Sequence, residues 1–314
     1  MKQLTLLTGA GVNLGVSHAC PFADEMLNFT YQKISLSVYD RIDPQLRALF
    51  TPESFDYILG GLLTVNLAIE KTKQDLRRFK MNEQAFAELF QQSNLQSSII
   101  AALEQLEKQL TISLGQMIQV VNSFTPVLTK LVASYDVVNY FTVNFDGIFD
   151  HILYGPGYSR IGICTDFWRG DGTMNQQAQQ KIRIHHLHGD LRYKQYKKTK
   201  LNNPPYKWHL LVVGDQEVKK GIIAGNEPLR FYNNRLRAVT ESREGITENI
   251  LAIVGFGFRD EDEHIVSRIR HAIQHTVYDR IYLFDPTDRL QNICKGQTWI
   301  HPANENLIAF LCRL

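Results

Sequence analysis

The stretch LTLLTGAG, residues 4–11, is a short apolar run that ends in a glycine turn. Such a run is typical of a buried β-strand, and the glycines after it permit a tight turn into a helix. Three later runs end in a similar manner, in TVNFD at 142–146, HLHGD at 186–190 and GFGFRD at 255–260. Because ligands of open α/β sheets bind at the carboxyl ends of the strands, the repeated pattern predicts a nucleotide-binding sheet.

The rest of the chain alternates between strand-like runs and helical patterns. Residues 263–275 place their apolar side chains on one helix face. Continuous apolar strands separated by helices are typical of a mostly parallel sheet with helices on both faces, so the expected fold class is α/β. Besides residues 4–7, the expected strands lie near residues 137–142, 161–167, 182–187, 210–213, 250–254 and 281–284.

Residues 43–133 differ in character, because helix formers dominate and strand-like runs disappear. Apolar residues from Leu95 to Val121 recur with the spacing 4-4-3-4-4-3-4, an eleven-residue repeat that keeps one stripe on a nearly straight helix. The stripe indicates an internal helix of a helical insertion, and an interface with a partner or a second copy is the alternative. We expect a single domain over residues 1–314 with this insertion at about 43–133.

Bulk composition excludes several classes of protein. With 44% hydrophobic and 21% charged residues, the chain is typical of a soluble globular protein, and a net charge of +2 indicates neither nucleic acid nor a membrane. The four cysteines form no CxxC pair, which argues against a structural zinc site and for a reducing compartment. No run reaches the roughly 18–20 apolar residues of a membrane helix, and polar residues interrupt the leader-like segment at 1–20. We therefore expect a cytoplasmic protein.

Two of the glycine turns suit a diphosphate. Gly9 and Gly11 let the backbone approach closely, and the amides at the start of the next helix point toward it. The stretch GVNLG at 11–15, which contains Asn13, departs from the full GxGxxG pattern, and many strand-to-helix turns carry two glycines for packing alone. Gly255 and Gly257 repeat the arrangement after a later strand.

Acidic residues follow that later turn and the last predicted strand. Asp260, with Glu261 and Asp262, could face a ligand or could simply favour a helix N-terminus electrostatically. Asp285 lies where an acid often accepts from ribose hydroxyls, and it suits a turn before Pro286 equally well.

The TVNFD motif is more specific. The Asn144 amide can donate and accept hydrogen bonds, so it suits ribose hydroxyls or a positioned water, and Asp146 can accept from ribose or orient a partner. The alternative is a strand-end turn in which both side chains bond their own backbone.

The HLHGD motif offers His188 before a glycine that permits a sharp turn. Histidine changes charge near neutrality and is the usual general base, although a structural histidine is the alternative. Three nearby histidines also raise the question of a metal site. Strand alternation places His186 and His188 on one face and His185 on the other, and no fourth ligand is evident, so we expect no metal.

In this order, the motifs resemble those of the sirtuin superfamily, particularly the divergent bacterial sirtuin-like domains. The matching pieces are GAG at 9–11, TxNxD at 142–146, HG at 188–189 and GxGxxD at 255–260. The resemblance spans nearly the whole chain, although it depends on fewer than about thirty residues. It implies a Rossmann-like, NAD-binding fold with a helical second module.

The resemblance also implies roles for particular residues. Asn144 would orient a water or a ribose hydroxyl beside the nicotinamide ribose, His188 would be the base at that ribose, and Asp146 would support them. The cofactor-binding residues expected on this basis are Gly9, Ala10, Gly11, Asn13, Thr142, Gly189, Gly255, Gly257, Asp260 and Asp285.

Departures from the sirtuin pattern point away from deacylation. Sirtuin deacylases carry a zinc module of two cysteine pairs after the HG motif, but no cysteine lies between Cys164 and Cys294. The usual DFR after the first turn is replaced by PFAD at 21–24, and Gly257 stands where divergent members usually have serine. Similar domains commonly cleave NAD in bacterial defence against phage, often gated by a partner protein.

The resemblance thus implies a hydrolase with NAD as its substrate, gated by a protein partner or homo-oligomer through the helical insertion. The alternatives are an NAD-dependent protein deacylase or ADP-ribosyltransferase, and a non-catalytic module that senses a nucleotide. The basic, aromatic segment 192–209 is interpreted as a solvated loop whose rings pack on the body, in preference to a binding site for single-stranded nucleic acid.

Overall fold

The computed structural model describes residues 1–9, 12, 130–131, 133–144, 182–190, 210–284, 300–302, 310–312 and 314. The strand predicted at 161–167 and the basic segment 192–209 lie outside these described residues, as does nearly all of the insertion predicted at 43–133.

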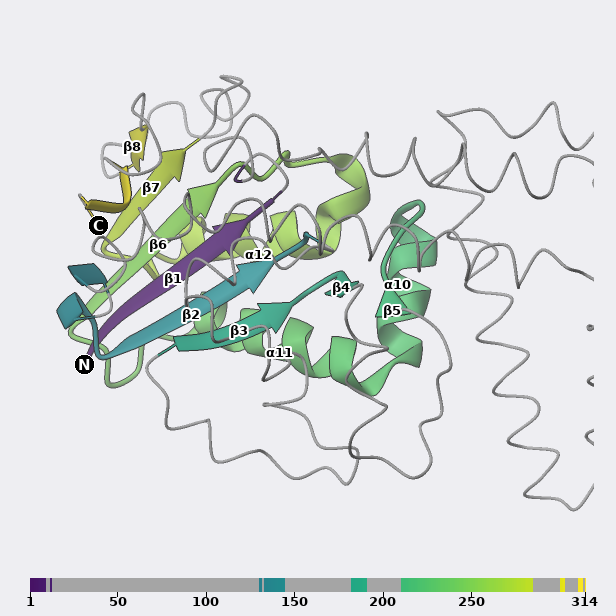
Figure 1. The fold of residues 1–314 in the computed structure, drawn as a ribbon, viewed down its shortest axis with the longest axis horizontal. Coiled ribbons are helices and arrows are strands. Elements are labelled where there is room, and N and C mark those ends of the chain that lie inside the picture. The colour runs from purple at the N-terminus through teal and green to yellow at the C-terminus, as the bar shows by residue number, and fades with distance from the viewer. Residues whose placement is uncertain are drawn as a thin grey trace, which may run out of the picture.

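Within the described part of the chain, six strands form one sheet whose neighbouring strands are all parallel (Figure 1). The strands are β1 (Lys2–Thr8), β2 (Val137–Thr142), β3 (Ile182–His186), β6 (Glu248–Val254), β7 (Arg280–Phe284) and β8 (Ile300–Pro302). Their order is β3-β2-β1-β6-β7-β8, so the chain builds outward from β1 on one side and then returns to build the other half from β6. This is the strand order of a Rossmann sheet, and it confirms the predicted fold class. The switch point lies between β1 and β6.

The strand predicted near residues 210–213 is shorter in the structure and lies outside the main sheet. Only β5 (Leu210–Leu211) is a strand, and it pairs antiparallel with β4 (Gly189–Asp190) in a separate two-stranded sheet. Gly189 has a φ of 87°, a backbone conformation that glycine adopts without strain. The turn at this glycine takes the chain away from β3, so Gly189 and Asp190 pair with β5 instead of extending the main sheet.

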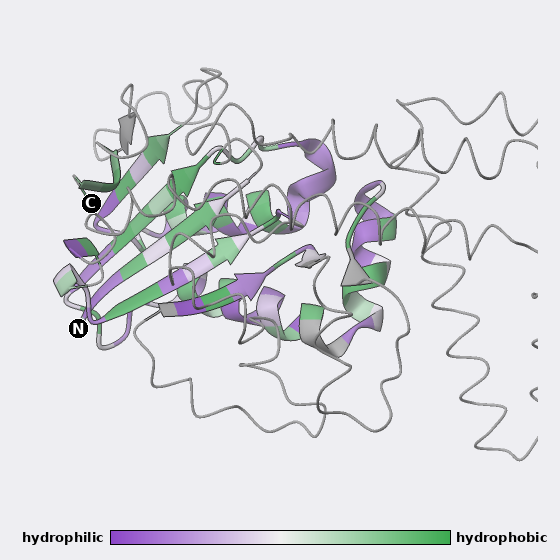
Figure 2. Ribbon diagram, viewed as in Figure 1, coloured by the Kyte–Doolittle hydropathy of each residue, from purple (hydrophilic) through white to green (hydrophobic). Residues whose placement is uncertain are grey.

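The strands are apolar on both faces, as expected for a sheet between two layers. Leu4 and Leu6 on one face and Leu7 on the other are all buried, and β6 is buried over Asn249–Val254. Figure 2 shows that hydrophobic residues concentrate in the middle of the sheet, whereas the helices mix hydrophobic and hydrophilic residues.

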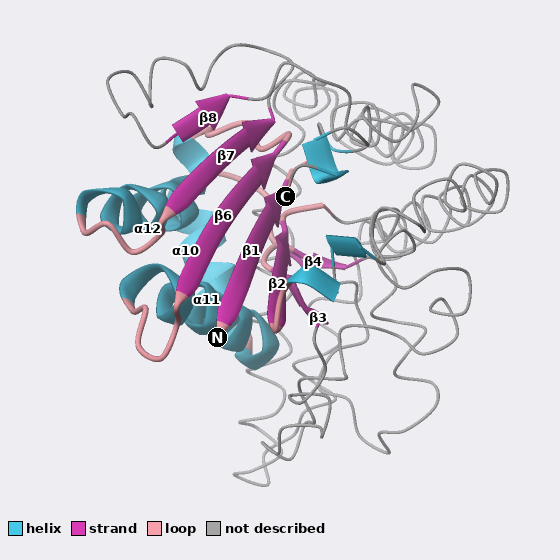
Figure 3. Cartoon of the chain, turned by 90° about the vertical axis from the view of Figure 1, so that its left-hand side faces the viewer, coloured by secondary structure: helices cyan, strands magenta, loops and turns pink. Residues whose placement is uncertain are grey.

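Three described α-helices follow the two-stranded sheet or β6: α10 (Gln216–Gly225), α11 (Glu227–Glu241) and α12 (Glu263–Gln274). Asp215 caps α10 by accepting from Val218 N at 2.8 Å, and a proline in the first turn begins α11. The helix predicted over 263–275 is confirmed as α12, which a short 3₁₀ turn, η5 (Asp260–Asp262), precedes. Helices α11 and α12 lie on the same side of the sheet (Figure 3).

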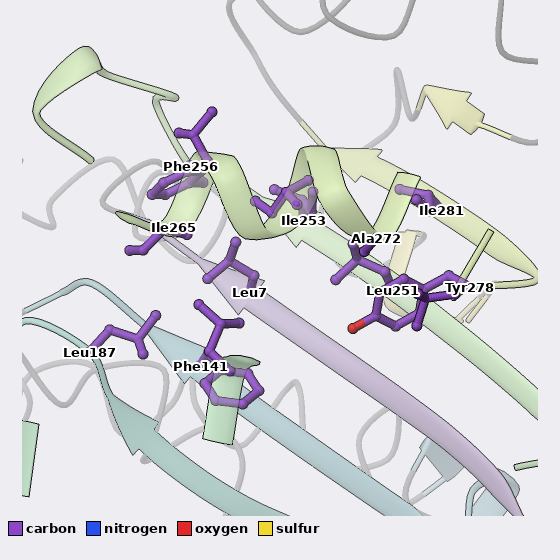
Figure 4. Packing of buried hydrophobic residues seen from close by; sticks show 14 of the residues in the cluster. Leu7, Phe141, Leu187, Leu251, Ile253, Phe256, Ile265, Ala272, Tyr278 and Ile281 are labelled. Atoms are coloured by element: carbon purple, nitrogen blue, oxygen red, sulfur yellow. The ribbon is translucent and has the colours of Figure 1, made fainter. Parts of the chain in front are cut away.

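The main core fills the space between these two helices and the sheet (Figure 4). Leu7, Phe141 and Ile253 from three strands meet Ile265 and Ala272 from α12. Burying a large apolar side chain contributes about 1.5–3 kcal/mol, so this layer fixes where α12 begins relative to the strand ends. None of the described helices is both long enough and apolar enough to cross a membrane.

Candidate functional site

The carboxyl ends of four strands lie level at one edge of the sheet. Val254 of β6 pairs with Thr8 of β1, Thr8 pairs with Thr142 of β2, and Thr142 pairs with His186 of β3. Each of the four sequence motifs begins at or beyond this row. Because neighbouring strands lie about 4.8 Å apart, the ends of β1 and β3 are on the order of 10 Å apart. One dinucleotide can therefore reach both.

At the switch point, the two glycine turns touch. The backbone N–H of Gly9 donates to Val254 O at 3.0 Å, and a Cβ on Gly9 would lie 2.6 Å from Gly255 O and 2.8 Å from Phe256 Cα. Gly255 has a φ of 59°. A side chain at position 9 would therefore collide with backbone. The other members of the first turn, Ala10 and Gly11, lie outside the described residues, as does Asn13.

Asn144 is buried just beyond the end of β2. Its backbone N–H donates to Thr142 Oγ1 at 3.1 Å, so the threonine hydroxyl supports this turn. The Asn144 Nδ2 atom is buried and has no hydrogen-bond partner among the described residues. The Nδ2 donor therefore does not bond the backbone of its own turn, and such an unsatisfied buried donor is uncommon in folded proteins. Asp146 lies outside the described residues.

His188 is buried in the turn after β3, where it contacts residues that follow β6 in the chain. Its Nε2 lies 3.1 Å from His264 Nε2 in the first turn of α12, and 3.6 Å from Asp262 Oδ1 in η5. Asp262 in turn accepts from Lys219 Nζ of α10 at 2.7 Å. Residues from three elements thus surround the imidazole.

Burial and neighbouring charges keep both imidazoles uncharged. Burial lowers the pKa of His188 well below its usual range, and the nearby Lys219 and His264 lower it further. Burial also lowers the pKa of His264 to about 4, although Asp262 opposes this effect. At neutral pH each ring therefore carries a proton on one nitrogen and a lone pair on the other, and a general base requires such a lone pair.

Several predictions change in detail. Asp262 occupies the N-cap position of α12 but makes no side-chain bond to that helix; it pairs with Lys219 instead. Asp260 and Gly257 are exposed, and a Cβ on Gly257 would meet only the Arg259 side chain, at 3.7 Å or more. The cofactor-binding roles expected of Asp260 and Gly257 stay predictions, and Asp285 lies outside the described residues.

The histidine grouping also differs from the one that strand alternation predicts. His185 stacks on Phe141 in the core, with 4.6 Å between ring centroids. His188 lies past the end of the strand, so alternation no longer governs it, and it joins Asp262 and His264 in a group whose ligand atoms all lie within 4.8 Å of one another. Such a group could hold a metal ion. The sequence signal that could have indicated His264 is its place four residues after the GFGFRD motif; Lys219 carries no such signal.

Comparison with known families supports the resemblance to sirtuins. A family model described as "SIR2-like domain" matches residues 138–301, just over half of the chain. The match runs from β2 into β8 and includes Asn144, His188 and the turn at Gly255. No curated protein matched the chain.

Proposed function

Because the chain belongs to the SIR2-like, or sirtuin-like, family, which includes NAD-dependent enzymes, we propose that it is an NAD hydrolase. The enzyme would cleave the nicotinamide–ribose bond and release nicotinamide and ADP-ribose. One observation carries the proposal: a buried amide with an unpartnered Nδ2, on Asn144, and a buried uncharged imidazole, on His188, lie beyond the ends of neighbouring strands. The glycine contact at the switch point lies on the next strand over.

The described residues fit a dinucleotide. Gly9 packs against the backbone of Gly255 and Phe256, so the two glycine turns meet at the point where Rossmann sheets hold a diphosphate. The Asn144 Nδ2 would donate to a ribose hydroxyl or to a water, which would satisfy an otherwise costly buried donor. Ala10, Gly11, Asn13, Thr142 and Gly189 are proposed to complete this binding surface, as the resemblance implies.

The proposed reaction needs few groups. The bond between nicotinamide and ribose C1′ breaks, and its electron pair leaves with nicotinamide, which becomes neutral. Water then attacks the positively charged ribose carbon and gives up a proton, which His188 accepts through its free lone pair. Asn144 would hold that water or the adjoining hydroxyl in line, and burial of the site would exclude competing water.

The test is chromatography of NAD incubated with the pure protein over a range of protein concentrations and without any peptide. We expect nicotinamide and ADP-ribose in equal amounts. Asn144→Ala and His188→Ala should each lower the rate about 100-fold or more, while the thermal transition changes little. Matched controls are Asn233→Ala, on a residue that bonds Leu229 O within α11, and His275→Ala, on the exposed end of α12.

Other results would support the alternatives. Product that forms only with an acylated peptide or an acceptor protein would indicate a deacylase or an ADP-ribosyltransferase. Binding of ADP-ribose without any release of nicotinamide would indicate a sensing module. Full activity of either Asn144→Ala or His188→Ala would show that the site is assigned to the wrong residues.

We further propose that the enzyme acts in the bacterial cytoplasm in defence against phage, and that self-association or a protein partner gates it. Support comes from the sirtuin-like resemblance and from the apolar stripe between Leu95 and Val121. Charged substitutions at Leu103 and Leu110 should prevent association in size-exclusion chromatography and make the rate per protomer independent of concentration. A monomer with full activity at every concentration would contradict gating by self-association.

A further inference from the structure

The group around His188 combines two uncharged imidazoles with one ion pair. Lys219 Nζ lies 2.7 Å from Asp262 Oδ1, and both side chains are more than nine-tenths buried. The same carboxylate oxygen lies 3.6 Å from His188 Nε2. In the described structure, the charged and titratable groups that face His188 from the elements packed against it are therefore Lys219 of α10, Asp262 of η5 and His264 of α12.

The ion pair decides how Asp262 acts on His188. A lone carboxylate within about 4 Å of an imidazole would favour the charged imidazolium. Lys219 balances that carboxylate, and its own positive charge opposes a second positive charge nearby. The start of α12, where His264 lies, adds the positive end of a helix dipole. The carboxylate can thus attract an N–H group without making the ring cationic.

The distances also distinguish the two nitrogens of His188. Its Nε2 faces both the Asp262 carboxylate, at 3.6 Å, and His264 Nε2, at 3.1 Å. Two neutral imidazoles this close share one hydrogen bond, in which one Nε2 donates and the other accepts. The Asp262 carboxylate acts on both rings, so it does not by itself choose between them. Because His264 engages His188 Nε2, only Nδ1 of His188 is left for a substrate, and the hydrogen bond made by one ring nitrogen fixes which nitrogen stays basic.

We propose that His264, Asp262 and Lys219 are positioning residues for His188: they hold its proton on Nε2 and leave Nδ1 as the basic atom that faces the reacting ribose. The role of Nδ1 as a base depends on the proposed NAD cleavage, whereas the position of the proton on Nε2 does not. Although Asp262 and two histidines could also bind a metal ion, the ammonium group of Lys219 already supplies the cation beside this carboxylate.

The first test measures His188 without any substrate. Nitrogen-15 spectra of the folded protein, with the His188 signals identified from a His188→Gln variant, report which ring nitrogen carries the proton. We expect the proton on Nε2 in the wild type and a mixture of both forms in His264→Leu. A proton on Nδ1 in the wild type, or an unchanged ring in His264→Leu, would overturn the proposal.

The second test removes charges from the ion pair between Lys219 and Asp262. Lys219→Met leaves Asp262 unbalanced, so the pKa of His188 should rise by about one unit. The double variant Lys219→Met/Asp262→Asn should return it toward the wild-type value and is also the safer variant to fold, because it leaves no unpaired buried charge. Lys220→Met, which removes the adjacent lysine from its exposed pair with Glu217, is the matched control. Equal titration of His188 in all four proteins would overturn the proposal.

The third test uses turnover. The acid limb of kcat/KM for NAD should move to higher pH by about one unit in Lys219→Met. His264→Leu should lower kcat about tenfold with little change in KM, and His264→Gln should retain most of kcat because its amide can replace Nε2. Absence of NAD cleavage in the wild type would contradict the proposed function while the spectra still judge this proposal. Joint displacement of the His188 and His264 signals by added Zn²⁺ alone would instead identify a metal site and overturn it.

Discussion

The two ends of the parallel sheet hold their ion pairs in opposite environments. At the amino ends, Glu248 of β6 pairs with Lys2 of β1 at 2.9 Å and with Arg280 of β7 at 3.4 Å, and Arg243 pairs with Asp279 at 3.1 Å. These charges remain partly or largely exposed to water. Such pairs contribute little each, and they cost little to form.

At the carboxyl ends, the polar groups are buried. Lys219 and Asp262 form an ion pair shielded from water, His188 is packed beside them, and the Asn144 Nδ2 has no partner within the described structure. Burial of charges and unpaired donors opposes folding, so it persists where another requirement demands it. The exposed pairs at the amino ends thus have little effect on stability in either direction, whereas the buried groups at the carboxyl ends oppose folding, which is consistent with the proposed ligand site there.

The largest effect should come from breaking the buried pair. Asp262→Asn leaves the ammonium of Lys219 buried without its counter-charge, and we expect the free energy of unfolding to fall by about 3–5 kcal/mol in urea titrations. Glu217→Gln breaks the exposed pair that Glu217 forms with Lys220 and should cost less than about 1 kcal/mol. Equal losses would show that burial does not distinguish these pairs.

Lowering the pH should cause a smaller loss of stability. Unfolded His264 binds a proton below its ordinary pKa of 6.5, whereas folded His264 does not do so until about pH 4. The unfolded state therefore holds more protons between these values, and the free energy of unfolding should fall as pH falls from 6.5 to 4, by at most about 3 kcal/mol for this group. His264→Gln should flatten this slope in urea titrations at several pH values. Parallel slopes for the two proteins would contradict the burial assigned to His264.

The next largest effect should come from the contact between Gly9 and Gly255. Gly9→Ala places a Cβ against the backbone of Gly255 and Phe256, and we expect a loss of about 1–3 kcal/mol together with weaker binding of NAD, measured by calorimetry. Gly221→Ala is the matched control, because a Cβ there meets no atom within 4 Å in helix α10 and alanine favours the helix. A Gly9→Ala protein as stable as Gly221→Ala would remove the argument for close approach at the switch point.

The sequence predicts the structural features that depend on residues close together in the chain. The apolar runs at 4–7, 137–142 and 250–254 correctly predict β1, β2 and β6, because buried parallel strands need continuous apolar residues. The apolar face of residues 263–275 likewise predicts α12. Residues 210–213 mislead, because pairing with β4 depends on the backbone conformation of Gly189 and not on the composition of the run itself.

The candidate site shows the same limit more strongly. His188, Asn144 and Gly255 could be identified because each follows an apolar run directly. Lys219 could not, and His264 only through its place four residues after the GFGFRD motif, because their contacts span 43 and 76 residues of sequence. No period or motif encodes the position of α10 and α12 against the end of β3; packing of the helices onto the sheet determines it.

The smallest effect should be at the amino end of the sheet. Lys2 is 59% exposed and Glu248 is 26% exposed, so water already screens both charges, and Glu248 keeps Arg280 as a second partner if Lys2 is removed. Lys2→Ala should therefore cost less than about 1 kcal/mol in urea titrations and leave the rate of nicotinamide release unchanged. A loss as large as that of Asp262→Asn would mean that the amino end contributes to stability beyond its ion pairs. The contrast between the two ends could then no longer be ascribed to burial.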